Sequence, residues 1–217
     1  MRINASQIGL STSLGQQTVI LPKPGQVDPM MVLLFGKRPA RRLDSRRYPR
    51  LKKALRKLQG IKEQVAELMG QPEELFAVDL CEGSNASISR DGRIGVGKDL
   101  LEAFPDDDEL WVGILGHEIG HAPWTWPEGD LSGLKKRDRD ALYRNEEAKA
   151  DRFAGRVLAD LGVRPDRICE FLLEAAAFEA HPPSDYYPAA VRAQMITEAF
   201  RRRARVLDRT GRRRDLR

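Results

Sequence analysis

Residues 116–122, Gly-His-Glu-Ile-Gly-His-Ala, constrain this chain of 217 residues more than any other stretch. His117, Glu118 and His121 form an HExxH pattern, and residues four apart lie on one face of a helix. Both imidazoles can therefore bind one metal ion, with Glu118 beside the open coordination position. The chain has only three histidines, and two of them fall in this pattern.

The residues that precede the pattern predict the helix it requires. An acidic run at 105–109 can cap a helix and complement its dipole. Apolar residues at Leu110 and Ile114 then lead into the pattern. We therefore expect a helix of about three turns, from about residue 107 to His121.

Length and composition fit one sizeable hydrophobic core. Hydrophobic residues make up 41% of the chain, and no apolar run approaches the roughly 18 residues of a membrane span. The first residues lack a basic start followed by an apolar block, and Cys81 and Cys169 do not suggest a disulfide framework. The simplest expectation is a cytoplasmic protein, with export without a cleaved signal as the alternative.

The net charge of +5 conceals two basic segments. Residues 37–57 hold eleven Lys or Arg against one acid, and residues 201–217 hold nine Arg against two acids. These segments could dock on nucleic acid, anionic lipid or an acidic protein. A solvated helix face and a frayed tail explain the same charges, and no nucleic-acid-binding motif accompanies them.

The pattern along the chain predicts one folded domain between two irregular ends. Residues 1–45 are expected to form a poorly structured arm or pro-segment, residues 46–205 the single domain that carries HExxH, and residues 206–217 a basic tail. Apolar periodicity and turn residues predict these elements beside the HExxH helix: helices at 46–69, 98–104, 137–161, 164–180 and 188–207, a strand at 75–81, and a hairpin at 85–97. Asp91-Gly92 predicts a type I′ turn in the hairpin.

A catalytic zinc site needs a third protein ligand. No histidine lies six residues beyond His121, so the extended metzincin pattern is absent. A glutamate on the next helix is the alternative, and helical periodicity does not choose between Glu146 and Glu147. Asp151 favours Glu147, because a carboxylate one turn from the ligand can hold a ligating imidazole by its other nitrogen.

The segment from about residue 85 to about residue 192 resembles the HtpX-like, CAAX-prenyl-protease-type gluzincin metallopeptidases. The shared motifs occur in the family's order: Asn85-Ala86, Ile94-Gly95-Val96, Leu100-Leu101, Asp108-Glu109-Leu110, His-Glu-Ile-Gly-His and Glu147-x-x-Ala150-Asp151. The transmembrane helices common in that family are missing from this sequence. The fold that the resemblance implies is α+β and zincin-like, with a small antiparallel or mixed sheet over the HExxH helix and a mainly helical C-terminal half.

The resemblance also implies roles for individual residues. One Zn²⁺ per chain is expected on three ligands, His117, His121 and Glu147. Asp151 is expected to support a ligating imidazole from behind. The strand near 85–89 is expected to form the upper rim of the cleft, where an extended substrate adds by main-chain hydrogen bonds to Asn85, Ala86 and Ser87.

A His-Pro element of the family matches His181-Pro182. Three interpretations of His181 stay open: it stabilises the oxyanion, it occupies the open zinc position in a resting state, or it is a surface histidine at a helix end. Arg192 lies eleven residues further on, beyond the family spacing, so its role stays open. Tyr186 and Tyr187 are further oxyanion candidates.

These features predict a zinc-dependent endopeptidase acting on a protein or peptide substrate. Zinc would polarise the scissile carbonyl and activate water, and Glu118 would pass a proton from that water to the leaving amine. The alternative is a latent or inactive metal-bound regulator that docks on nucleic acid or an acidic partner through its basic segments. Cys81 is either a latency ligand or a half-buried strand residue. The sequence defines neither the substrate nor the oligomeric state.

Overall fold

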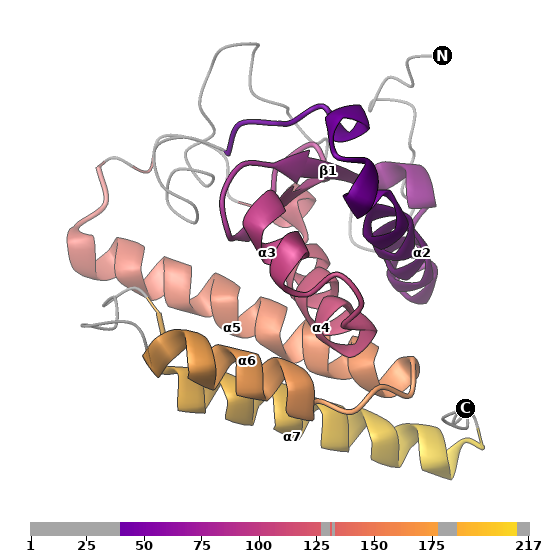
Figure 1. Cartoon of the computed structure of the whole chain (residues 1–217). Helices are drawn as coiled ribbons and strands as arrows, with labels where there is room; N and C mark the ends of the chain where they lie inside the picture. The colour runs from indigo at the N-terminus through magenta and orange to yellow at the C-terminus, as the bar shows by residue number, and fades with distance from the viewer. Residues whose placement is uncertain (1–39, 127–130, 132, 178–185, 212–217) are drawn as a thin grey trace.

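The computed structural model describes residues 40–126, 131, 133–177 and 186–211. A small sheet and helix α2 lie above the HExxH helix α4, and three helices are stacked below it (Figure 1). The helices are α2 (Lys52–Leu68), α3 (Lys98–Ala103), α4 (Asp108–Gly120), α5 (Lys136–Asp160), α6 (Asp166–Ala177) and α7 (Ala189–Arg209). The strands are β1 (Ala77–Cys81), β2 (Ala86–Ile88) and β3 (Arg93–Gly97). The predicted α+β class with a mainly helical C-terminal half is confirmed.

The sheet is mixed, with strand order β1-β3-β2. β1 pairs with β3 in parallel, and β2 pairs with β3 antiparallel. Ile88, Ile94 and Val96 are fully buried, because alternate side chains of a strand face the core. A bridge between Arg42 and Cys81 lies along the outer edge of β1. Within the described chain no strand pairs with the outer edge of β2.

The turn between β2 and β3 differs from the prediction. Gly92 has a φ of 79°, but Ala122 is the only non-glycine residue of the described chain with a positive φ. A type I′ turn needs a positive φ at both central residues, so the prediction of this turn at Asp91-Gly92 is wrong. The Gly92 N–H donates to the Ser89 carbonyl, and the Ser89 N–H donates to the Arg93 carbonyl. The hairpin therefore closes over a three-residue loop that ends in a left-handed glycine.

Helix α4 is the central element of the fold. It is apolar on nearly all sides, as expected of a helix enclosed by other elements. The Asp107 side chain caps it by accepting a hydrogen bond from the Leu110 N–H at 3.1 Å, which confirms the predicted acidic start. Ala122 then turns the chain away with a φ of 44°. The indole N–H of buried Trp126 donates to the His121 carbonyl at 3.1 Å and fixes this end.

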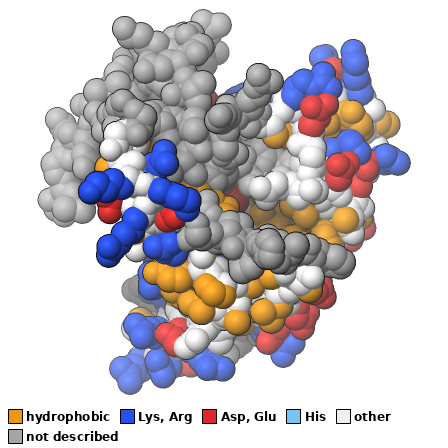
Figure 2. Space-filling model, turned by 90° about the vertical axis from the view of Figure 1, so that its left-hand side faces the viewer, with side chains coloured by type: hydrophobic (Ala, Val, Ile, Leu, Met, Phe, Trp, Pro, Cys, Tyr) orange, Lys and Arg blue, Asp and Glu red, His pale blue; other side chains and the backbone are white. Residues whose placement is uncertain are grey.

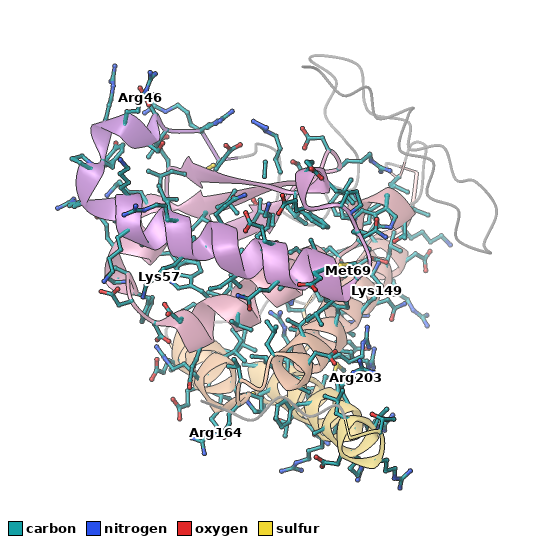
Figure 3. All side chains as sticks on the ribbon, turned by 90° about the vertical axis from the view of Figure 1, so that its right-hand side faces the viewer. Arg46, Lys57, Met69, Lys149, Arg164 and Arg203 are labelled. Carbon is teal, nitrogen blue, oxygen red and sulfur yellow. The ribbon has the colours of Figure 1, made fainter. Side chains whose placement is uncertain are left out.

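Helix α2 packs against the sheet. Figure 3 shows it lying across the front of the sheet, with the labelled Lys57 near its start and Met69 at its end. Its buried face packs on β1 and α4 through Ala54, Leu58, Ile61, Val65 and Ala66. The helix thus supports both α4 and the sheet.

Helices α4 and α5 cross at unusually short range. A Cβ added to Gly120 would lie 3.0 Å from the Ala150 Cα, and one added to Gly116 would lie 3.3 Å from the Ala154 Cα. Helix α7 then packs on α5 at Gly155, where an added Cβ would lie 2.3 Å from the Ile196 carbonyl oxygen. Glycine permits such backbone contact because it has no side chain.

Gly155→Ala should therefore destabilise the protein by about 1–3 kcal/mol, because the new methyl group has to displace the backbone of α7. Gly60→Ala in α2 is the matched control. No atom lies within 4 Å of its added Cβ, and it should stabilise by roughly 0.5–1 kcal/mol. Urea unfolding of both variants measures the difference, and equal stabilities would contradict the close contact of α5 with α7.

Candidate metal centre

Three side chains from two helices converge on one point. His117 lies in the last turn of α4, His121 caps its end, and Glu147 faces them from α5. Possible ligand atoms of the three residues all lie within 4.8 Å of one another. His117 Nε2 is 3.3 Å from Glu147 Oε2, and His121 Nε2 is 3.6 Å from Glu147 Oε1. Ligand atoms about 2.1 Å from a tetrahedral zinc ion lie roughly 3.4 Å apart, so this donor set fits zinc.

The two candidate glutamates point in different directions. Glu147 is only 3% exposed and contacts both histidines. The Glu146 carboxylate instead lies 2.5 Å from the Lys149 ammonium group. The ambiguity left by helical periodicity is therefore resolved by geometry, and Glu147 is the residue that completes the His-His-Glu group.

Asp151 and Arg192 form a second layer behind the histidines. His117 Nδ1 lies 2.9 Å from Asp151 Oδ1, within hydrogen-bond distance. Arg192 on α7 donates Nε to Asp151 Oδ2 at 2.8 Å and Nη2 to Asp151 Oδ1 at 2.9 Å. The same Nη2 is 3.1 Å from Glu147 Oε2. The Nδ1 contact of His117 leaves its Nε2 directed at Glu147, the orientation that a metal ligand needs.

The charges of this cluster shift the pKa values of its members. Burial alone would lower the pKa of His117, but the charge of Glu147 and the hydrogen bond to Asp151 raise it to about 10. Burial and the neighbouring His117 lower the pKa of His121 to about 3. Burial opposes ionisation of Asp151, but hydrogen bonds from His117 and Arg192 hold its pKa at about 2. Two ionised carboxylates thus lie beside one imidazole that stays neutral and one imidazole that favours its protonated, positively charged form.

Glu118 lies on α4 beside the two histidines. It is 5% exposed, and within the described chain its Oε2 atom has no hydrogen-bond partner. Burial raises the pKa of Glu118 to about 7, and the positive charge of His117 acts against this shift. His117, Glu118 and Glu147 all line one cavity of about 140 Å³. The carboxylate oxygen of Glu118 is therefore in a position to accept a hydrogen bond from a molecule in this cavity.

Only some of the predicted substrate-binding and oxyanion residues line the cavity. Asn85 and Ala86 line the cavity at the rim formed by β2. Ser87 pairs with β3 and is not among the residues lining the cavity. Tyr186 lines the cavity, and its hydroxyl group is hydrogen-bonded to that of a buried tyrosine, Tyr143. His181 lies outside the described residues.

Arg192 is the site residue whose role the sequence analysis left open. It comes from the last helix, 45 positions after Glu147 and 41 after Asp151. One signal was present in the sequence: Arg192 is on the same helical stripe as Ile196 and Ala199, both of which are buried. A charged residue on a buried stripe needs a partner, but the stripe does not identify that partner.

The basic segments contain arginines that pair with acids of the same chain. Arg42 lies 2.8 Å from Asp79, and Arg203 lies 2.7 Å from Asp160. Docking on nucleic acid or an anionic partner stays a prediction. No helix in the described parts of the chain is long and apolar enough to cross a membrane.

Residues 52–124 match the family model described as Peptidase family M48. The matched segment includes α2, the sheet and the HExxH helix, and the third ligand from α5 completes the site outside it. This segment is thus similar to Peptidase family M48, and the His-His-Glu group is of the kind typical of a zinc site in M48 peptidases. Comparisons with curated proteins and with solved structures gave no match.

Glu147→Gln should weaken zinc binding by more than about 100-fold, because it replaces a charged ligand at a buried position. Glu146→Gln removes the neighbouring carboxylate, which lies against Lys149, and should leave zinc affinity unchanged. Competition with a chromophoric chelator measures both affinities. Equal losses in the two variants would show that Glu147 is not a ligand.

Asp151→Asn should lower zinc affinity by about 10- to 100-fold, because the amide no longer holds the His117 imidazole as a carboxylate does. Asp160→Asn is its control, since Asp160 is also on α5 and also pairs with an arginine of α7. The control should lose some stability but no zinc affinity. The same chelator competition, together with thermal unfolding, separates the two effects.

Proposed function

We propose that the chain is a zinc-dependent endopeptidase. The observation that carries the proposal is the placing of Glu118 in the same cavity as His117 and Glu147, with His121 completing the ligand set. A peptidase family implies a protein substrate, and the cavity is lined by Asn85 and Ala86 at the start of β2, an outer strand of the sheet. Metal ligands, a carboxylate and a strand edge are the parts that hydrolysis of an extended peptide requires.

In this proposal Glu118 moves the proton. A bound zinc ion would polarise the scissile carbonyl and increase the acidity of water at its open position. Glu118 accepts a proton from the attacking water as the oxygen–carbon bond forms, and donates it to the amide nitrogen as the carbon–nitrogen bond breaks. Its Oε2 atom is suited to this role because no other group of the described chain occupies it. The reaction consumes one water molecule and leaves a carboxylate and an amine.

The other residues of the site orient the reacting groups. Arg192 fixes Asp151, and Asp151 fixes the His117 ring with Nε2 directed at the ligand position. The outer edge of β2 would offer main-chain groups of Ala86 to a substrate strand, and Asn85, whose carbonyl accepts the Gly97 N–H, lines the cavity beside it. Ser87 extends this strand. We keep His181 as a proposed donor to the oxyanion.

Glu118→Gln should preserve the fold and zinc binding but reduce peptide hydrolysis by about 100- to 10,000-fold, because the amide cannot take the proton. The assay is cleavage of an unstructured protein by the zinc-loaded full chain, followed by mass spectrometry. Glu146→Gln, which alters a carboxylate outside the cavity, should retain wild-type activity. Undiminished cleavage by Glu118→Gln would refute the mechanism.

A further inference from the structure

A groove of about 640 Å³ lies between helices α5 and α7, where Figure 3 shows the labelled Arg203. Among the described residues, none lines both this groove and the metal-centre cavity. Its charged lining residues are four arginines and a single acid: Arg152 and Arg156 from α5, and Arg202, Arg203 and Glu198 from α7. Arg203 lies 2.7 Å from Asp160, and Arg202 lies 3.9 Å from Glu198. We call this site the arginine groove.

The two arginines that α5 contributes pair with no acid in the described parts of the chain. Arg152 donates to a backbone carbonyl of its own helix at 3.3 Å, and the Arg156 guanidinium lies 5.4 Å from the centre of the Phe153 ring. Burial and the positive charge of Arg203 lower the pKa of Arg156, while the charge of Asp160 acts against them. A carboxylate that entered the groove would therefore stabilise positive charge that the fold leaves without an ion-pair partner.

Apolar side chains of α7 line the same groove. They recur along the helix from residue 191 to residue 206, at Val191, Met195, Ala199 and Val206. At 1.5 Å per residue this stretch is about 22 Å long. Val206 is 47% exposed, and Figure 2 shows hydrophobic side chains next to Lys and Arg in the lower part of the molecule, where Figure 1 places α6 and α7. A groove of this length between two packed helices can seat the apolar face of a third helix.

The other basic segment that the sequence showed, residues 37–57, has less charge left for a partner. Several of its side chains lie against acids of other segments: Arg41 with Glu82, Arg42 with Asp79, Arg50 with Glu102, Lys53 with Asp106, and Lys57 with Asp108. The positive charges on α5 at the arginine groove have no such partners in the described chain. The groove is therefore the better site for an anionic partner.

The lining of the groove also selects among anionic partners. No aromatic side chain is among its described lining residues, so nucleic-acid bases would find nothing to stack on, and phosphates gain nothing from its apolar side chains. A second copy of the chain, related by a two-fold axis at the groove, would bring arginines against arginines. Residues 1–39 hold four Lys or Arg against one acid, so they lack the complementary charge.

We propose that the arginine groove docks an acidic amphipathic helix of a partner protein. The apolar face of that helix packs on Val191, Met195 and Val206 of α7. Its Asp or Glu side chains pair with Arg152 and Arg156 of α5. Because the groove and the metal-centre cavity share no described lining residue, a docked partner leaves the cavity free for a substrate. This docking site does not depend on the proposed peptidase function.

The first test uses a fluorescein-labelled helical peptide of about 15 residues, the length that the groove accommodates, with Leu along one face and Glu on both sides of it. The full chain is used as Glu118→Gln, so that the peptide is not cleaved. It should bind this peptide about tenfold or more tightly than the same peptide with Gln in place of every Glu. Fluorescence anisotropy measures both affinities. Undetectable binding, or equal binding of the two peptides, would overturn the proposal.

Two pairs of variants locate the binding site. Arg152→Gln combined with Arg156→Gln should weaken binding of the acidic peptide by about tenfold or more. Arg47→Gln combined with Arg56→Gln is the matched control, because it removes two exposed positive charges outside the groove and leaves the protein with the same net charge. The control should keep its affinity. Equal losses in the two pairs would show that the peptide responds to the overall charge and not to the groove.

The apolar side of the groove has its own pair. Val206→Gln should weaken binding by roughly threefold or more, because it removes apolar contact area from the docked helix. Leu68→Gln on α2 is the control, since Leu68 is also an exposed apolar residue, at 38%, and lies outside the groove. It should bind like the parent chain. An unchanged affinity of Val206→Gln would show that the helix does not lie along α7.

The other classes of partner are tested with the same proteins. A short DNA duplex, a single-stranded RNA, and vesicles of equal parts phosphatidylcholine and phosphatidylserine should each bind more weakly than the acidic peptide at physiological salt. Tighter binding of any of them that is lost in the Arg152→Gln, Arg156→Gln variant would overturn the choice of a protein helix. Absence of Glu118-dependent cleavage would contradict the peptidase function alone, because the peptide titrations do not involve turnover.

Discussion

The metal centre depends on the short distance at which α4 and α5 cross. Gly116 and Gly120 of the HExxH segment lie against Ala154 and Ala150 of α5, with almost no side-chain atoms between the two backbones. A larger residue at this crossing would move α5 outward and take Glu147 away from the histidines. The glycines on either side of His117 therefore matter as much for the geometry of the site as the ligands themselves, although they have no chemistry of their own.

The crossing also buries charges, and the fold has to compensate for them. Glu147 and Asp151 are at most 3% exposed, and an unpaired carboxylate at such a depth is strongly destabilising. Arg192 supplies the compensating charge from α7. Its contacts to both acids offset the free-energy cost of removing its own charge from water. The last helix of the chain is thus coupled to the metal centre, since the site is complete only when α7 has docked on α5.

The sequence was sufficient for features that arise locally. HExxH and its acidic cap predicted α4 and its two candidate metal ligands, and the order of the remaining elements followed from periodicity. Features that depend on contacts between distant segments were not accessible. Periodicity could not choose between Glu146 and Glu147, and nothing in the sequence indicated that Arg192 would meet Asp151. The wrong turn type at Asp91-Gly92 has a similar cause, because this dipeptide fits both a two-residue turn and the longer loop observed.

The part of the cavity wall formed by α6 escapes sequence analysis for a further reason. Ile168 and Leu172 are four residues apart on one face of α6, and a face that lines a cavity has the same pattern as one that fills a core. Ile168 serves both purposes, because it is 4% exposed and packs on Gly113 while lining the cavity. A larger side chain there would disturb the packing of α6 on α4. Leu172 also lines the cavity but is only half-buried, so a substitution there should cost less stability than one at Ile168.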